Sequence, residues 1–191
     1  MAVDKPIALK EWASAIKALE NGTQIFIMRK GGIVEETRDF QVEADAFYLY
    51  PTYEHQRKAL LKEEFQPMID KSLESWSIQD STVDIRTYAK LVHDFEIMEQ
   101  AQLQALLTDH IWTENFTEER LKWKRKNPLH LMVLRVYKLD KPMQVSIQDA
   151  YLGCKSWIQL LDAPAEPSMK PVLSDEEFTA RLSQIRQKLE N

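Results

Sequence analysis

Apolar and charged residues alternate along the stretch from Val83 to Ile97, and this alternation constrains the fold more than any other feature of the sequence. Its apolar positions are Val83, Ile85, Ala89, Leu91, Phe95 and Ile97. Successive side chains of a β-strand point to opposite faces of the sheet, so a period of two predicts a strand with one buried face. Because a typical strand has about 5–6 residues, we expect this one to bend or break near Tyr88.

Shorter patterns predict further strands and several helices. Apolar runs and alternations predict strands at 24–28, 40–42, 47–49, 129–139, 145–147 and 156–161. Apolar residues at helical spacing predict helices at 9–19, 52–65, 103–111 and 118–125, with Thr52 and Thr117 as caps of the second and fourth. The predicted fold class is α+β, with a mostly antiparallel mixed sheet and packed helices.

The C-terminal part of the chain differs in composition from the rest. Residues 1–161 are expected to form the α+β core domain, and the proline content of residues 162–173 predicts a linker. Ser174 and Glu177 then form a capping box, followed by apolar residues at helical spacing. Residues 174–191 are therefore expected to form an amphipathic helix, which docks on the core, on a partner or on a second copy of the chain.

Net charge and cysteine content narrow the range of partners and compartments. The formal net charge is -5, whereas a non-specific nucleic-acid binder normally carries a large positive field. Any phosphate site must therefore be local. Cys154 is the single cysteine, so no intramolecular disulfide can form, and we see neither a signal peptide nor an apolar run long enough for a membrane helix. We expect a cytoplasmic protein.

The first candidate for a phosphate site is the pair Arg29 and Lys30, which precedes Gly31 and Gly32. Exposed backbone N–H groups of a glycine turn, together with two cations, could hold a phosphate. The same residues also fit an ordinary hairpin turn with solvated charges.

The second candidate is the basic segment around Trp123, with Arg120 before it and Lys124 after it. Cations beside an aromatic ring can hold a nucleic-acid backbone while the ring stacks on a base. The acidic residues of this predicted helix precede its basic ones, however, and that order also complements the helix dipole without any ligand.

Arg135 is the third candidate, because it shares a predicted strand face with Leu131 and Val133. A buried guanidinium needs a charged partner, since an unpaired one costs several kcal/mol. Arg135 therefore forms either a structural salt bridge, with a carboxylate such as Glu11, or an anion site.

The remaining candidates are histidines and aromatic residues. His110 lies on the apolar side of its predicted helix. A functional site would require His55, His110, Arg120, Arg135 and Tyr151 to line a common pocket, and the stacking surface would be Trp112, Trp123 or Trp157. The histidines lack the spacing of metal ligands, and we expect neither a metal nor a cofactor. A histidine hydrogen-bonded in the core is the alternative for His110.

A set of local signatures resembles a known protein family. The signatures are Glu11-Trp12, Arg29-Lys30-Gly31-Gly32-Ile33, Pro51-Thr52-Tyr53-Glu54-His55-Gln56, His110-Ile111-Trp112, Pro128-Leu129 and Tyr151-Leu152-Gly153-Cys154-Lys155-Ser156-Trp157. Together they resemble the uncharacterised bacterial proteins of domain of unknown function 1802, over the chain to about Leu161. The resemblance implies no activity. A basic patch beside a small mixed β domain is also similar, more loosely, to PUA-type RNA-binding modules.

Three functions remain open from the sequence. The favoured one is a binding module for a phosphate-bearing ligand, RNA or nucleotide, at a local basic and aromatic site. The second is a phosphoesterase or nuclease that uses His55, His110 and Arg135. The third is an interaction module that binds a partner or a second copy through residues 174–191.

Overall fold

The computed structural model of the protein describes residues 6–30, 40–123, 127–161 and 163–190. Its strands are β1 (Ile7–Trp12), β2 (Phe26–Arg29), β3 (Ala46–Thr52), β4 (Thr82–Ile97), β5 (Leu129–Ser146), β6 (Trp157–Gln159) and β7 (Met169–Pro171). Its α-helices are α1 (Ala13–Glu20), α2 (Pro67–Glu74), α3 (Gln100–Ala105), α4 (Glu114–Lys122) and α5 (Asp175–Glu190).

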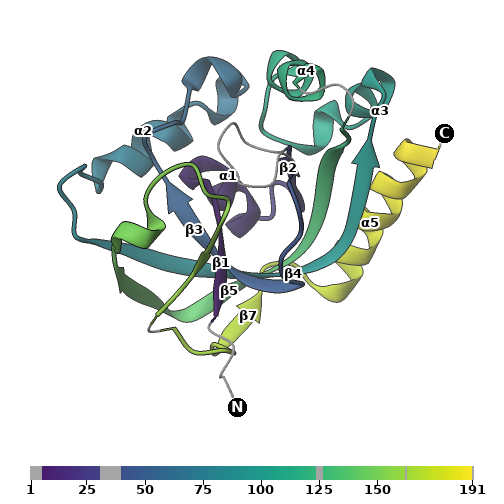
Figure 1. Ribbon diagram of the computed structural model, residues 1–191. Coiled ribbons are helices and arrows are strands. Elements are labelled where there is room, and N and C mark those ends of the chain that lie inside the picture. The colour runs from purple at the N-terminus through teal and green to yellow at the C-terminus, as the bar shows by residue number, and fades with distance from the viewer. Residues whose placement is uncertain (1–5, 31–39, 124–126, 162, 191) are drawn as a thin grey trace.

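The strands form one curved sheet in the order β2-β5-β4-β3-β1-β6, and β7 pairs with β5 beside this path. Strands β1 and β3 are parallel, whereas the other described pairs are antiparallel. Helices α1 to α4 lie above the sheet in Figure 1, and the segment that leads to β6 lies on its other side. The predicted α+β class with a mostly antiparallel sheet is confirmed.

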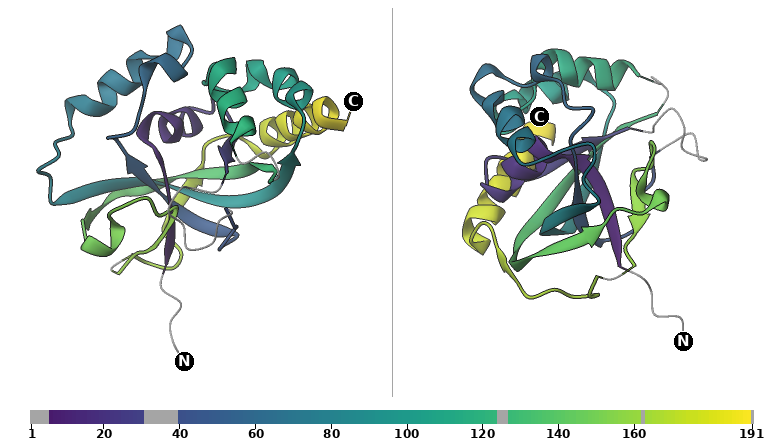
Figure 2. Two further views of the ribbon diagram at one scale, coloured as in Figure 1. Left: turned by 45° about the horizontal axis from the view of Figure 1, so that its top comes forward. Right: turned by 90° about the vertical axis from the view of Figure 1, so that its left-hand side faces the viewer.

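Strands β4 and β5 are the long elements of the sheet and run side by side across the molecule (Figure 2). The alternation of residues 83–97 correctly predicts β4. The strand is continuous through Tyr88, and its pairing with β5 is irregular on either side, between Ile85 and Thr87 and between Leu91 and His93. These bulges supply the bend expected of so long a strand. Strand β5 also merges the two strands predicted at 129–139 and 145–147.

The N-terminal residues differ most from the sequence prediction. The helix expected at 9–19 begins only at Ala13, because residues 7–12 pair with β3 on one side and β6 on the other. Ala8 and Leu9 are fully buried. A strand buried on both faces has no alternation to reveal it, and the three-residue spacing of Leu9 and Trp12 imitates a helix.

Three further predicted elements differ from those in the structure. Thr52 is the last residue of β3 and caps no helix. The helix expected at 52–65 is replaced by short 3-10 turns at Lys58–Leu60 and Glu63–Phe65, and α2 begins afterwards, at Pro67. A proline fits the first turn of a helix, where its missing N–H is not needed. The helix expected at 103–111 is α3 followed by a 3-10 turn at Leu107–Asp109. Residues 40–42 form no strand.

Helix α4 begins earlier than predicted and has a different cap. Its N-cap is Thr113, whose hydroxyl oxygen accepts a hydrogen bond from the Phe116 N–H at 3.3 Å. Thr117, the predicted cap, is buried within the helix and donates to the Glu114 carbonyl. Thr113 and Thr117 are both followed by acidic residues, so the sequence does not show which of the two threonines caps the N-terminus of α4.

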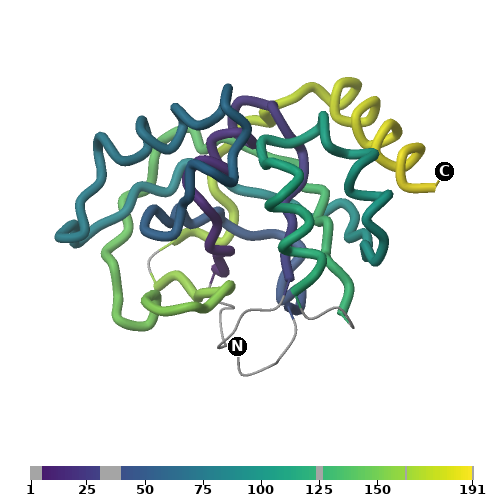
Figure 3. Tube along the Cα trace, turned by 90° about the horizontal axis from the view of Figure 1, so that it is seen from above, coloured from purple at the N-terminus to yellow at the C-terminus, as the bar shows by residue number. Residues whose placement is uncertain are grey.

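The C-terminal helix α5 packs against the core, as Figures 1 and 3 show from two directions. Its side chains Phe178 and Ile185 are buried in the same cluster as Phe26 and Leu129. The capping box is present: the Ser174 N–H donates to the Glu177 carboxylate at 2.9 Å, and the Glu177 N–H donates to the Ser174 hydroxyl at 3.2 Å. The expected linker contains the short strand β7, which pairs with β5.

Candidate functional site

The C-terminal ends of β1 and β2 bring Glu11 and Arg29 together. The Arg29 guanidinium donates to the Glu11 carboxylate at 3.3 Å, to the Lys10 carbonyl at 3.1 Å and to the Ser156 hydroxyl at 2.6 Å. Glu11 is only 6% exposed, and its second carboxylate oxygen accepts from the Trp12 N–H at 2.7 Å. Arg29 is thus fixed by three partners, and Glu11 is the carboxylate that neutralises it.

Arg120, on α4, is the second cation of this region. Its guanidinium lies 5.0 Å from the centre of the Phe116 ring. Burial and the neighbouring Arg29 guanidinium lower the pKa of Arg120, and Glu11 opposes that shift. In the described part of the chain, no carboxylate lies within salt-bridge distance of Arg120. The negative charge of one buried carboxylate, Glu11, therefore offsets the positive charges of both Arg29 and Arg120.

Arg57 adds a third guanidinium from the loop after β3. It is exposed, pairs with Glu119 at 3.5 Å and also lowers the pKa of Arg120. We refer to Arg29, Arg57 and Arg120, with Glu11 among them, as the arginine cluster. Arg57 is not predicted as a site residue from the sequence, although it directly follows the signature that contains His55.

Lys10 lies beside the arginine cluster and ties it to the loop before β6. Its ammonium group donates to the carbonyl oxygens of Tyr151 at 2.7 Å and Gly153 at 2.8 Å. Burial lowers the pKa of Lys10. Tyr151 therefore contributes a backbone carbonyl here, whereas its hydroxyl accepts from the N–H of Leu161, which follows β6.

The other half of the first candidate pair, Lys30, has a structural role. Its side chain is buried, and its ammonium group donates to the Leu121 carbonyl at 2.6 Å, near the C-terminus of α4. A cation at this end of a helix is favourable for the dipole and satisfies an open carbonyl. Gly31, Gly32 and Lys124 lie outside the described residues.

Arg135 lies away from the arginine cluster and holds α5 in place. Its guanidinium donates to the Asp175 carboxylate at 2.8 Å and lies over the rings of Phe178 and Tyr137. Of the two roles left open by the sequence, the structure favours the salt bridge. Its partner is the exposed Asp175 and not Glu11, which pairs with Arg29.

His110 is a core histidine. The residue is 2% exposed, Nδ1 accepts from the Trp112 N–H at 3.2 Å, and the ring meets Phe26 edge-on. Burial, reinforced by the nearby Lys62, lowers the pKa of His110 to about 3. The imidazole is therefore neutral at physiological pH.

The remaining candidates are divided between the surface and the core. His55 is exposed on the loop after β3. Trp157 is buried, stacks on Phe40 and donates its indole N–H to the Gln41 carbonyl at 2.8 Å, so its ring faces cannot receive a ligand. No hydrogen bond, ion pair or ring contact among the described residues joins any two of His55, His110 and Arg135.

The described residues contain no group of three metal-ligating side chains close enough to hold an ion. Within the same residues, none of the helices is long and apolar enough to cross a membrane.

A family model described as a domain of unknown function, DUF1802, matches residues 8–184. The chain belongs to the DUF1802 family. The match includes every residue of the arginine cluster and reaches into α5. A search of curated proteins found no match.

Solved structures similar to this DUF1802 chain include the ASCH protein of Zymomonas mobilis, with 12% identity and a TM-score of 0.44 over 94% of each chain. A tyrosine-to-phenylalanine mutant of that protein has 10% identity and a TM-score of 0.42, covering 94% of this chain and 96% of that one. A serine-to-alanine mutant has 10% identity and a TM-score of 0.44, covering 95% and 96%. At these values the likeness does not extend to a site or a ligand.

Proposed function

We propose that this DUF1802 protein binds a phosphate-bearing ligand, RNA or a nucleotide, at the arginine cluster. The observation that carries the proposal is Arg120, whose guanidinium is partly buried beside Arg29 without a carboxylate at salt-bridge distance in the described chain. A partly buried charge without full compensation is costly, and an anionic ligand would remove that cost.

The chemistry of the cluster fits phosphate. A guanidinium presents a planar fork of N–H donors that matches two phosphate oxygens, and its charge-assisted hydrogen bonds are stronger than neutral ones. Arg29 is already fixed by Glu11 and Ser156, which leaves Arg120 and the exposed Arg57 to adjust to the ligand.

An exposed aromatic side chain follows α4, the helix that carries Arg120. Trp123 is the residue at which α4 ends, three positions after Arg120, and its backbone is already extended. Its side chain is 44% exposed, whereas Trp112 and Trp157, the other stacking candidates, are buried. A base of a single-stranded nucleic acid could stack on Trp123 while its phosphate contacts Arg120.

The structure gives less support to the other two functions. Hydrolysis by His55, His110 and Arg135 would need these side chains in one place, yet one is exposed, one is buried and neutral, and one holds α5. For an interaction module, the apolar stripe of α5 would have to be available, and its residues Phe178 and Ile185 are buried against the core of the same chain.

The test compares the wild type with Arg120→Gln and the matched control Arg186→Gln, which removes one exposed charge from α5. Fluorescence anisotropy with labelled single-stranded RNA at low ionic strength gives the affinities. A hydrogen bond to a charged group contributes about 1.5–3 kcal/mol, so Arg120→Gln should weaken binding about tenfold or more. Arg186→Gln should bind like the wild type. If the wild type does not bind RNA or nucleotides, or if both variants lose equal affinity, the proposal is wrong.

A further inference from the structure

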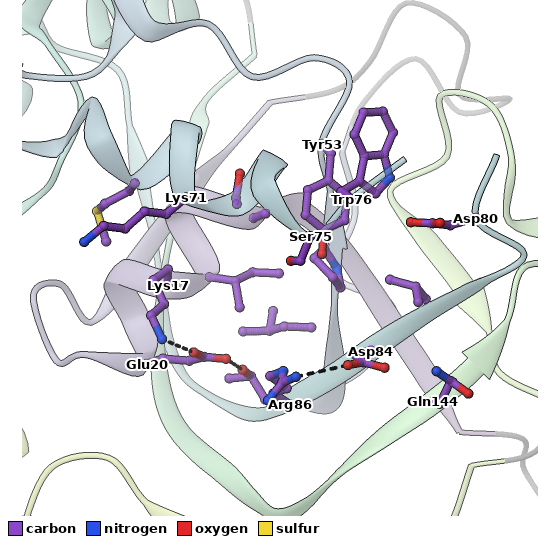
Figure 4. A pocket seen from close by; sticks show the side chains of 18 of the residues that line it. Lys17, Glu20, Tyr53, Lys71, Ser75, Trp76, Asp80, Asp84, Arg86 and Gln144 are labelled. Atoms are coloured by element: carbon purple, nitrogen blue, oxygen red, sulfur yellow. Dashed lines mark hydrogen bonds and ion pairs between the residues drawn. The ribbon is translucent and has the colours of Figure 1, made fainter. Parts of the chain in front are cut away.

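A cleft of about 610 Å³ opens between α1, α2 and the strands β3 and β4, and none of the candidate site residues from the sequence lines it (Figure 4). Its volume is in the range of small-molecule sites. Helix α1 forms one wall, α2 with the loop after it forms another, and β4 forms the floor. We refer to it as the α1–α2 cleft.

One wall of the cleft is aromatic. Tyr53 and Trp76 stack with ring centres 5.4 Å apart and ring planes 14° from parallel. Both are only partly buried and both line the cleft. Stacking occupies one face of each ring, so a planar ligand can extend the stack on the opposite face of either ring.

The cleft also contains a buried hydrogen-bond acceptor, Glu20. Its carboxylate accepts a hydrogen bond from the Thr87 hydroxyl at 2.6 Å and is 3.3 Å from the Lys17 ammonium group (Figure 4). Glu20 is the last residue of α1, where the helix dipole disfavours a negative charge, so helix stability does not explain it. A carboxylate has about four acceptor positions, and these two partners leave room for N–H donors of a ligand.

The charges of the cleft cancel, unlike those of the arginine cluster. Three cations and three carboxylates line it: Lys17, Lys71, Arg86, Glu20, Asp80 and Asp84. Arg86 and Asp84 pair with each other at 3.0 Å. A balanced lining gives no general attraction for a phosphate, whereas it suits a neutral group with its own donors and acceptors.

We infer that the α1–α2 cleft binds a nucleobase, which stacks on the Tyr53–Trp76 pair and donates N–H hydrogen bonds to Glu20. The inference rests on the proposed function in its choice of a nucleobase as the planar group. Burial and the nearby Asp84 raise the pKa of the Tyr53 hydroxyl further above neutrality, so it remains a hydrogen-bond donor that can bind the same ligand.

The loop after β3 connects the α1–α2 cleft with the arginine cluster. It begins with Tyr53 in the cleft and ends with Arg57 in the cluster. Between them, the Gln56 side chain accepts from the Ser14 N–H at 2.8 Å and donates to the Ser72 hydroxyl at 3.0 Å, which fixes the loop to α1 and α2. One strand of nucleic acid could thus place a base in the cleft and a phosphate at the cluster.

Phosphate-free nucleosides test the cleft separately from the cluster. Adenosine, guanosine, cytidine and uridine are titrated into the full chain by calorimetry. At least one should bind the wild type, and Trp76→Ala and Glu20→Gln should each weaken it about tenfold. Trp76→Phe should restore most of the affinity. The controls Ile78→Ala, which truncates an exposed apolar side chain near Trp76, and Glu176→Gln should not change it.

The outcomes separate the two ideas. If RNA binds the wild type while all four nucleosides fail to bind, the cleft assignment is overturned and the proposed function stands. If a nucleoside binds equally well to Trp76→Ala and Glu20→Gln, the base lies elsewhere and the assignment is again overturned. If nucleosides bind as expected while RNA affinity does not depend on Arg120, the cleft assignment stands and the phosphate site is wrong.

Discussion

His110 and His130 lie in opposite electrostatic surroundings, although both occur in apolar stretches of the sequence. His110 is buried among Phe26 and Trp112, and burial lowers its pKa to about 3. His130 is hydrogen-bonded to Asp94 at 2.8 Å, and this bond raises its pKa despite partial burial. The two residues should therefore couple folding to pH with opposite signs.

For His110, the unfolded chain takes up a proton below a pKa of about 6.5, whereas the folded protein does not until the pH approaches about 3. Stability should therefore fall as the pH is lowered below about 6.5, by up to about 1.4 kcal/mol per pH unit from this residue. His110→Asn, whose side-chain oxygen can still accept from the Trp112 N–H, should remove that contribution. Urea unfolding of both proteins across the acidic range measures it, and parallel curves would contradict the assignment.

His130 should behave in the reverse way. Its folded pKa lies above the unfolded value, so its contribution is complete below the unfolded pKa and is lost as the pH rises through the folded pKa. His130→Asn should therefore destabilise the protein more in mildly acidic than in alkaline solution. The same urea series measures this difference, and a loss that grows with pH would show that Asp94 does not stabilise the imidazolium.

At the scale of single elements, α5 shows how a polar and an apolar contact combine to dock a helix. The Arg135–Asp175 pair joins a buried guanidinium to a carboxylate that is 96% exposed, so solvent screens it. The buried side chains Phe178 and Ile185 provide the apolar part of the contact. Removal of the apolar part should therefore cost more than removal of the ion pair.

Ile185→Ala should lower the free energy of unfolding by about 2–5 kcal/mol, because it removes buried methyl groups and leaves a cavity. The neighbouring Gln184→Ala, at an exposed position of the same helix, should change it by less than about 0.5 kcal/mol. Denaturant unfolding of both variants gives the comparison. If Ile185→Ala is as stable as Gln184→Ala, α5 is not docked on the core in solution.

The sequence predicts elements well where one face is buried and the other is solvated. Strand β4 has such an alternation, and the α5 capping box identifies the start of its helix. Strand β1 is predicted as part of a helix because its neighbouring residues Ala8 and Leu9 are both buried, so its sequence lacks the alternation of apolar and polar residues that indicates a strand. Helix α2 is not predicted because Ile69 is its only buried residue, so its sequence has no apolar stripe.

The arginine cluster could be predicted only in part. Arg29 and Arg120 are recognisable as cations beside a glycine pair and an aromatic residue. Their proximity depends on β2 and α4 meeting at the end of β1, a long-range arrangement that no local pattern encodes. The α1–α2 cleft had no local signal at all, since its lining comes from α1, β3 and the loop after it, α2 and the loop after it, and β4.

At the scale of the whole molecule, a net charge of -5 coexists with a local excess of guanidinium groups. Long-range attraction for RNA should therefore be weak, and binding should involve few phosphates. Each phosphate of a single strand that is neutralised contributes about -0.7 to the slope of log affinity against log salt concentration. If each of the three guanidiniums of the arginine cluster neutralises one phosphate, the slope can be no steeper than about -2.

The salt dependence of RNA binding by the wild type, Arg120→Gln and Arg186→Gln tests the phosphate site most directly. A wild-type slope between about -1 and -2 is expected, and Arg120→Gln should make it shallower by about 0.7 while Arg186→Gln leaves it unchanged. The site would be contradicted if the slope were near zero, or if loss of the Arg120 charge altered it no more than loss of the Arg186 charge.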